Sequence, residues 1–320
     1  MRNTLLCFIL AYTAVAATAS AQDYPARHVR IVVPYAPGGS NDVVGRLIGG
    51  KLSENMKQQF IVENRAGAAG TIGTAHVVNS APDGYTLLVA SAGAITTAPS
   101  MYQKLPYDPL RDLTPIMNIV FQPNILVVHP SVPVTTTKEF IALAKANPNK
   151  FTYGSSGVGA TQHLASELFS LMTGARLVHV PYKGGGPAMA GIMSGEIDFM
   201  FSVLPTAVPL INNGKLRPIA MTTSRRAKAF PKLPTVDESG LPGFEISGFI
   251  ALFAPAKVPQ DIAAKLQSAA AKTLTPEVQE RLVGLGLDVD GGPAEKFSAF
   301  LKQDIARYAR VVKAANIPLQ

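Results

Sequence analysis

The sequence has very little cysteine, and this shortage excludes several kinds of site. The only cysteine, Cys7, lies inside the N-terminal apolar segment Thr4–Ala17. This segment and the following Ala19-Ser20-Ala21 are typical of a cleavable signal peptide over residues 1–21, and the segment is shorter than the roughly 20 apolar residues that cross a bilayer. The mature chain would begin near Gln22 without a cysteine. Disulfides, thiolate metal sites and a cysteine nucleophile are therefore not expected.

Charge is also scarce. Charged residues make up 16% of the chain and hydrophobic residues 47%, which indicates a packed globular protein. The formal net charge is +8, yet no run of lysine and arginine is longer than Arg225-Arg226, and no aromatic residues accompany the basic ones. Because nucleic-acid binding needs clustered cations and stacking rings, we expect no nucleic-acid partner. Diffuse positive charge can still raise the capture rate of small anions.

The common enzyme motifs are missing. The sequence has no G-x-x-x-x-G-K-[ST], no H-E-x-x-H and no G-x-S-x-G, and its five histidines lack metal-ligand spacing. Gly157-Val158-Gly159 continues with Ala160-Thr161-Gln162, so the third glycine of a dinucleotide motif is absent. We therefore expect no enzyme activity, no cofactor and no metal. A hydrolase that uses a hydroxyl from the segment Ser155–Thr161 with His163 stays open as an alternative.

Short β-rich runs alternate with helical patterns along most of the chain. Val29 to Pro34 is an apolar β-rich run that ends at a Pro-Gly-Gly-Ser turn, and apolar residues at helical spacing follow. Further strands and a second glycine-initiated helix continue this order as far as the strand Tyr85 to Ala90. Strand, turn, helix and strand in this order are the βαβ pattern of a parallel sheet. The pattern returns in the middle of the chain, and helical patterns dominate after Pro255.

These patterns predict an α/β fold with two lobes, a division that suits a chain of 320 residues. Each lobe would be a mixed, mainly parallel sheet flanked by helices. The chain is expected to cross between the lobes near Ile119–Ile125 and Gly248–Ala254. Lobe 1 would then comprise residues 22–122 and 249–320, with the C-terminal helices covering it, and lobe 2 residues 123–248.

Glycine-rich turns between strands and helices are the candidate ligand sites. In parallel α/β sheets they lie at the carboxyl ends of the strands, where the next helix presents unpaired N–H groups and the positive end of its dipole. Such turns bind carboxylate or phosphate without buried cations. We expect contacts from the backbone of Gly38 and Gly39 and from the Ser40 hydroxyl. Asp42, in the first helical turn, either caps the helix or contacts the ligand.

Three further turns have the same character, with hydroxyl groups, glycine backbone and one cation. The contacts expected there are Ser91, Ala92, Ser155, Ser156, Gly157, Thr161, Lys183, Gly185 and Gly186. Tyr35 and Phe201 either wall the pocket or belong to the core. Asp198, an acid within an apolar run, either orients a ligand hydroxyl or amine or hydrogen-bonds a neighbouring loop.

Several motifs occur along the chain in a recognisable order. The most specific is Val62–Gly70 (VENRAGAAG), which runs on to Ala81–Leu87 (APDGYTL). The others are Pro34–Asp42 (PYAPGGSND), Tyr107-Asp108-Pro109, Val180–Gly184 (VPYKG), Leu216–Ala220 (LRPIA) and Gly240–Glu245 (GLPGFE). Together they resemble the substrate-binding proteins of tripartite tricarboxylate transporters, also called Bug-type receptors. The resemblance covers essentially the whole mature chain.

The resemblance implies a type II periplasmic-binding-protein fold and a ligand between the lobes, usually a di- or tricarboxylate. It implies a periplasmic protein of a Gram-negative bacterium that delivers its ligand to the membrane permease of a tripartite transporter. At matching positions it assigns ligand contacts to Gly39, Ser40, Asp42, Ser91, Ser155, Ser156, Thr161, Lys183, Gly185, Gly186 and Asp198.

Cations are few in the candidate loops. Only Lys183 and Arg46 are available, whereas a fully charged tricarboxylate such as citrate would need several arginine partners. A mono- or dicarboxylate is therefore the preferred ligand. A receptor that docks on a sensor kinase ectodomain instead of a permease stays open as an alternative, and we expect the protein to act as a monomer.

Overall fold

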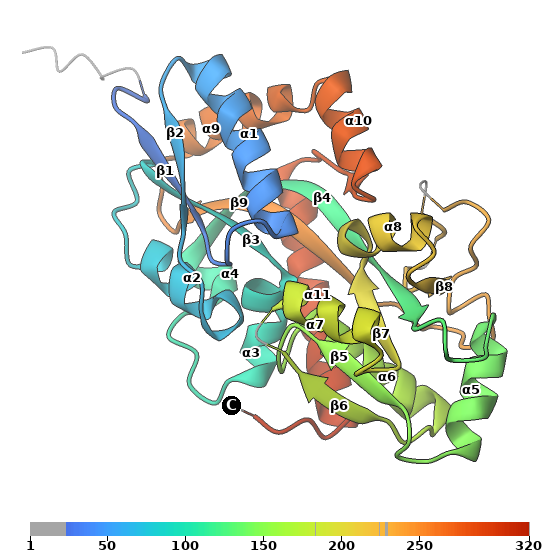
Figure 1. Cartoon of the computed structure of the whole chain (residues 1–320). Coiled ribbons are helices and arrows are strands. Elements are labelled where there is room, and N and C mark those ends of the chain that lie inside the picture. Colours follow the sequence, from blue (N-terminus) through green and yellow to red (C-terminus); the bar gives the residue numbers. More distant parts are fainter. Residues whose placement is uncertain (1–23, 183, 224, 228–229, 320) are drawn as a thin grey trace, which may run out of the picture.

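The computed structural model describes residues 24–182, 184–223, 225–227 and 230–319 (Figure 1). The predicted signal peptide, residues 1–21, and the candidate contact Lys183 lie outside this part of the chain. Within the described residues, no helix combines the length and the apolar character needed to cross a membrane.

Three parallel strands form one side of the molecule. They are β1 (Val29–Val33), β2 (Phe60–Asn64) and β3 (Thr86–Ser91), with β1 in the middle. The connections are the helix α1 (Ser40–Met56) and then η1 (Ala68–Gly70) with α2 (Thr71–Val78). The β-branched and apolar side chains of β1 and β3 are fully buried, as expected for strands covered on both faces.

A second parallel group lies on the other side. It consists of β5 (Thr152–Ser155), β6 (Val178–Pro181) and β7 (Phe199–Val203), with β5 in the middle. The helices α6 (Thr161–Thr173) and α7 (Gly185–Ser194) connect them. The strand β8 (Arg217–Met221) pairs with β4, which is described next.

Two strands tie the groups together. β4 (Leu113–Val128) pairs with β9 (Ser247–Pro255) over its first part and with β7 and β8 over its second part. The short strand β10 (Asp288–Val289) also pairs with β4, and the strand order is β2-β1-β3-β9-β4-β7-β5-β6. Every antiparallel pair of strands includes β4 or β9. The predicted mixed α/β sheet is confirmed, while the residue boundaries of the two lobes stay a prediction.

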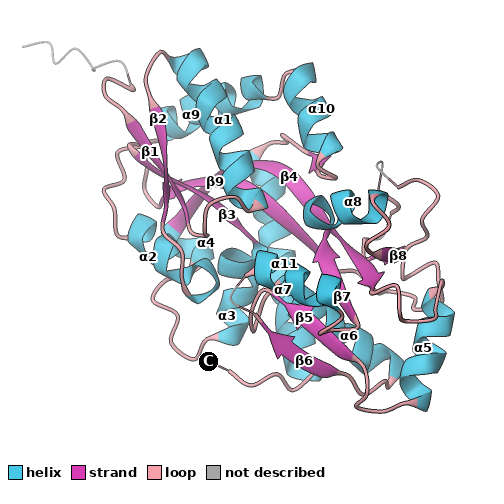
Figure 2. Ribbon diagram, viewed as in Figure 1, coloured by secondary structure: helices cyan, strands magenta, loops and turns pink. Residues whose placement is uncertain are grey.

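Helices cover both sides of these strands (Figure 2). The remaining ones are η2 (Gly93–Thr97), α3 (Ala98–Met101), α4 (Pro109–Asp112), α5 (Thr137–Ala146), α8 (Leu204–Asn212), α9 (Gln260–Thr273), α10 (Pro276–Gly284) and α11 (Ala294–Ala314). α5 begins with a capping box in which Thr136 and Glu139 bond each other's backbone N–H groups. α11 packs on β4, on η2 and α3 and also on α6, so it contacts elements of both strand groups.

Candidate functional site

The strand register determines which strand ends face one another. β3 runs parallel to β4, because each is antiparallel to β9 between them. β7 runs antiparallel to β4, and β5 runs parallel to β7. The carboxyl ends of β1 and β3 therefore point along β4 toward its second half, and those of β5, β6 and β7 point back toward its first half.

The middle of β4 separates these two sets of strand ends. Ser91, the last residue of β3, is level with Ile250 of β9 and through it with Val120 of β4. Val203, the last residue of β7, is level with Asn124 of β4. The backbone from Val120 to Asn124 spans roughly 13 Å at about 3.3 Å per residue. The turns at the two sets of strand ends can therefore contact opposite ends of one small molecule.

The first loop (residues 34–42) joins β1 to α1. Gly38 adopts a left-handed φ of +84°, and Gly39 precedes α1 without a side-chain cap. The first helical hydrogen bond is donated by the Val43 N–H, so the preceding N–H groups have no partner within the helix. The Ser40 hydroxyl accepts a hydrogen bond of 2.6 Å from Gln122 Nε2, which attaches this loop to the middle of β4.

Asp42 organises the first loop through three hydrogen bonds and an ion pair. Its carboxylate accepts from the Gly38 N–H at 3.0 Å, from Asn64 Nδ2 at 2.9 Å and from Arg46 Nε at 3.1 Å, and Arg46 Nη2 lies 3.0 Å from its other oxygen as an ion pair. Partial burial raises the pKa of Asp42, but these hydrogen bonds outweigh it and leave the pKa below its usual value. Both oxygens are engaged within the protein, so the structure gives Asp42 the shaping role rather than ligand contact.

Beside the first loop, Tyr35 and Ser91 bond each other. Ser91 Oγ lies 2.9 Å from the Tyr35 hydroxyl, and burial of this phenol raises the pKa of Tyr35. A side chain at Gly70 would come within 3.0 Å of the Tyr35 ring, so glycine is needed there for this ring to fit. Ala92 was expected to contact the ligand, but its side chain is fully buried among core residues.

The second loop (residues 155–161) joins β5 to α6. Gly157 and Gly159 have φ values of +134° and +78°, which other residues rarely adopt. Ser156 Oγ donates to Gln162 Oε1 at 2.9 Å, and Thr161 is the first residue of α6, which begins without a side-chain cap. The Ser155 side chain is fully buried and turns inward toward His179 Nε2 at 2.7 Å. Ser155 therefore supports the loop from inside.

The third loop joins β6 to α7 and comprises Tyr182 and residues 184–186 of the described chain. Gly184 precedes α7 without a side-chain cap and has a φ of +121°. A Cβ at Gly185 or Gly186 would meet nothing within 4 Å, so there is open space beside both residues. They are the first residues of α7, so their N–H groups have no partner within the helix, and they follow the carboxyl end of β6.

Two further predicted contacts lie away from these loops. The Asp198 carboxylate accepts from the N–H and the hydroxyl of Thr152 at 2.8 and 2.9 Å. It lies at the amino ends of β5 and β7, so the structure supports the loop-bonding role for Asp198 and not ligand contact. Phe201 is fully buried, stacked on Phe244 and packed against Phe169, so it belongs to the core and does not wall a pocket.

Three polar residues that were not among the expected contacts lie where the loops approach. Gln122 bonds Ser40, and the Thr97 hydroxyl donates to the Gly159 carbonyl at 3.0 Å, linking η2 to the second loop. Asn124 is fully buried, and its amide nitrogen and oxygen have no partner within the described chain. A sequence signal was available, because Gln122 and Asn124 are two of the few polar positions in a mostly apolar strand.

The hydrolase alternative finds little support in this geometry. The histidine next to Ser155 is His179, whereas His163 Nδ1 accepts from the Gly159 N–H at 3.1 Å. Burial lowers the pKa of His179 to about 4, which makes it a weak base at neutral pH. Ser155 is also inaccessible to a substrate. Among the described residues, no cluster of histidine, cysteine or acidic side chains could hold a metal ion.

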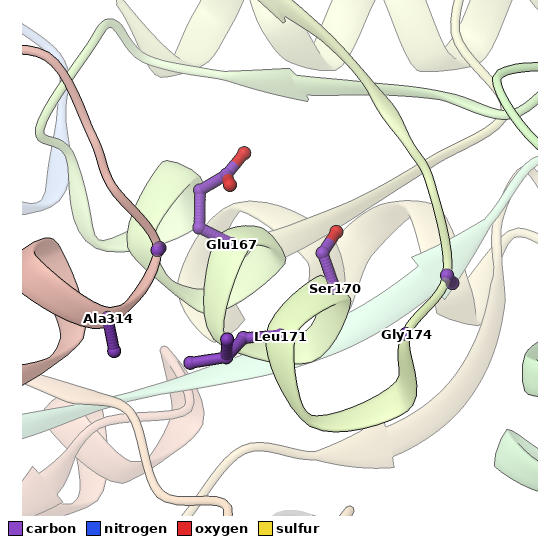
Figure 3. A pocket seen from close by; sticks show the side chains of 7 residues that line it. Glu167, Ser170, Leu171, Gly174 and Ala314 are labelled. Atoms are coloured by element: carbon purple, nitrogen blue, oxygen red, sulfur yellow. The ribbon is translucent and has the colours of Figure 1, made fainter.

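Two surface hollows lie elsewhere. One, of about 340 Å³, lies between α6 and the end of α11 and is lined by Glu167, Ser170, Leu171 and Ala314 among others (Figure 3). The second, of about 460 Å³, lies beside the end of α1 and along α9. Neither is lined by a residue of the three loops. The strand ends remain the better candidate, because their unpaired N–H groups are suited to an anion.

A comparison with protein families matches residues 44–317 to the model described as "Tripartite tricarboxylate transporter family receptor". The chain belongs to this receptor family. A relative, Protein BugT of Bordetella pertussis, is 34% identical over 97% of this chain and 96% of its own length.

Solved structures of this receptor family have the same fold. Rpa4515 of R. palustris with adipate superimposes with a TM-score of 0.88 at 35% identity, covering 93% of this chain and all of that one. MatC of Rhodopseudomonas palustris with bound malate gives 0.83 at 31% identity, covering 90% of this chain and all of that one. The fold expected from the resemblance is therefore confirmed.

Proposed function

We propose that this receptor captures a small mono- or dicarboxylate between its two lobes and delivers it to the membrane permease of a tripartite transporter. It acts as a monomer in the periplasm, after removal of residues 1–21, and performs no catalysis. The ligand is held by the first loop on one side and by the second and third loops on the other.

The observation that carries this proposal is the meeting of strand ends across the middle of β4. Three helices, α1, α6 and α7, begin at these ends, and none of them has a side-chain cap. Their free N–H groups and dipoles favour an anion on each side of the gap. A ligand that contacts both sides would favour a closed arrangement, because only differential binding shifts such an equilibrium.

The charges around the site support a mono- or dicarboxylate rather than a tricarboxylate. Arg46 is bonded to Asp42 and Asn64, so it is committed to the first loop. Backbone N–H groups can hold one carboxylate on each side of the gap, whereas a third would need a cation of its own. The relatives with bound adipate and malate are consistent with this ligand class.

The test is a thermal-shift and calorimetry panel on protein that has been unfolded, freed of ligand and refolded. Adipate, malate, acetate and citrate are compared, with adipamide as the uncharged counterpart of adipate. A ligand at about 100 times its Kd should stabilise the native state by roughly 2.7 kcal/mol. We expect a shift with one of the mono- or dicarboxylates and none with adipamide.

Two outcomes would contradict the proposal. Binding of citrate far more tightly than of adipate or malate would rule out the preferred ligand class. Equal binding of adipate and adipamide would mean that the free N–H groups do not recognise charge. Delivery to the permease is tested separately, by capturing the permease subunits on the immobilised, ligand-loaded receptor.

A further inference from the structure

The second loop rests on a group of stacked rings. The rings of His163 and His179 are nearly parallel, with centroids 4.1 Å apart, and Tyr153 stacks on His179 at 4.8 Å. The three side chains come from α6, β6 and β5, so they join the elements on either side of the loop. None of these rings is needed to explain the ligand contacts proposed above.

Each imidazole bonds a different part of the second loop. His179 Nε2 lies 2.7 Å from Ser155 Oγ, and this hydroxyl also accepts from the Gly157 N–H at 3.2 Å. His163 Nδ1 accepts from the Gly159 N–H at 3.1 Å. The loop is therefore held at its start by one ring and near its end by the other.

The contact with Gly159 requires an uncharged ring. A doubly protonated imidazole has no acceptor, so protonation of His163 would break its bond with the Gly159 N–H. Burial, together with the neighbouring His179, lowers the pKa of His163 to about 3, and burial lowers that of His179 to about 4. The other ionisable groups facing the rings are Tyr153 and Glu167, which bond each other.

Gly159 also connects this support to the opposite side of the site. Its carbonyl accepts from the Thr97 hydroxyl of η2, and a side chain at Gly159 would come within 3.1 Å of Met101 in α3. One peptide group is thus fixed by His163 and the next by Thr97. A change in either support would shift the loop relative to β3 and the first loop.

We propose that His163 and His179 are positioning residues, a stacked imidazole pair that holds the second loop in the shape that receives the ligand. This inference rests on the proposed function, because it assumes that the second loop binds the carboxylate. A positioning role differs from a purely structural one, because it depends on the hydrogen-bonding nitrogens of the imidazoles and not only on the space that the rings fill.

The experiment compares variants that keep or remove these atoms. His163→Asn places an acceptor oxygen near the Nδ1 position, and His179→Gln places an amide near the Nε2 position. His163→Phe and His179→Phe keep an aromatic ring but remove the hydrogen bond. All four are compared with the wild type at pH 7.5 by hydrogen exchange of the Gly159 and Gly157 amides without ligand, and by calorimetry with adipate and malate as probes.

We expect His163→Phe to raise the exchange rate of the Gly159 amide about tenfold, and His179→Phe to raise that of the Gly157 amide about tenfold. Each variant should also bind adipate or malate, whichever the wild type binds, about tenfold more weakly. His163→Asn and His179→Gln should remain within about threefold of the wild type. Equal losses in the Phe variants and in their polar counterparts would overturn the proposal in favour of a structural role. Unchanged exchange and affinity in the Phe variants would overturn it as well.

Failure of the proposed function gives a different result. If the wild type binds no carboxylate in the panel, that function fails, while the exchange data still decide whether the two imidazoles position the loop. If one Phe variant does not fold, the test rests on the Phe variant and the polar variant of the other histidine. Amide exchange in His163→Asn and His179→Gln is still compared with the wild type.

Discussion

The first and second loops have the same proposed role in ligand binding but are supported in opposite ways. The first loop is exposed from Ala36 to Gly39 and is shaped by charge, through Asp42, Arg46 and Asn64. The second loop rests on buried rings that act without charge, through His163 and His179. The first loop should therefore respond to substitutions that remove the charge of Asp42. The second loop should respond to protonation of the two histidines at acid pH.

The largest expected effect tests whether both loops bind the ligand through their backbone. Gly39→Val and Gly185→Val should each weaken binding of the carboxylate about 100-fold, roughly 2.7 kcal/mol, because a side chain would occupy the space of the ligand. We expect neither to destabilise the free protein, since a Cβ at Gly39 would meet only one atom, at 3.8 Å, and a Cβ at Gly185 would meet nothing within 4 Å. Calorimetry and thermal unfolding measure the two effects.

Gly50→Val is the matched control, because a side chain at Gly50 of α1 would also meet nothing within 4 Å and this residue lies away from the strand ends. Loss of affinity at only one of Gly39 and Gly185 would mean that the ligand is held by one side alone.

A second prediction separates the loops by pH. Both imidazoles have a folded-state pKa below the ordinary histidine value of 6.5, so the unfolded chain binds more protons as the pH falls. The stability that they contribute is complete above about pH 6.5 and is lost progressively toward pH 3. Asp42 behaves differently, because its pKa is lowered from 3.8 and its contribution is lost only below that pH.

Urea unfolding between pH 7.5 and 4 measures this difference. The double variant His163→Asn/His179→Gln should lose stability less steeply than the wild type as the pH falls, with up to two fewer protons taken up on unfolding. His28→Asn, at an exposed histidine, is the control. If the unfolding free energies of the wild type and the double variant fall equally with pH, His163 and His179 are not the groups whose protonation destabilises the protein.

A third prediction concerns the charged support of the first loop. Asp42→Asn should cost about 1–3 kcal/mol of unfolding free energy at pH 7, because the Gly38 N–H and Arg46 lose a carboxylate acceptor. Asp83→Asn removes the exposed pair with Arg27, which lies at 3.1 Å, and should cost less than about 1 kcal/mol. Chemical denaturation of both variants makes the comparison, and equal losses would show that the first loop does not depend on Asp42.

These expectations depend on details that the sequence reveals only in part. The alternating pattern of β-rich runs and helices was sufficient to predict parallel strands connected by helices. The length of β4 was not visible, because Pro115, Gln122 and Pro123 interrupt the pattern and register shifts occur along the strand. An interrupted strand that serves two sheets has no single periodicity to detect.

The sequence indicated the glycine turns of the candidate site, but it did not indicate which side chains turn inward. Glycine turns reveal themselves by composition, so the turns at Gly39 and Gly185, which lie at the starts of α1 and α7, were expected, while their contact with a ligand stays a prediction. Asp198 directly precedes β7, and Phe201 lies within β7, but sequence alone does not tell which face of a strand a residue occupies. The contact of His179 with Ser155 joins neighbouring strands, and no local pattern encodes it.

The smallest expected effect concerns the contact between the two sides. Thr97→Val removes the hydroxyl that bonds the Gly159 carbonyl and should weaken ligand binding about two- to tenfold, since one neutral hydrogen bond is worth about 0.5–1.5 kcal/mol. Thr273→Val, in which the lost bond lies within α9, is the control and should leave affinity unchanged. Calorimetry decides, and equal affinities in all three proteins would remove Thr97 from the site.

The position of β9 in the sheet also affects how the chain folds as it is made. β9 lies between β3 and β4, so the first group of strands lacks its neighbour until Ser247–Pro255 have been synthesised. Chain synthesis proceeds at about 5–20 residues per second, and pairings between segments so distant in the sequence form slowly. The first group of strands therefore lacks the strand beside β3 for most of translation.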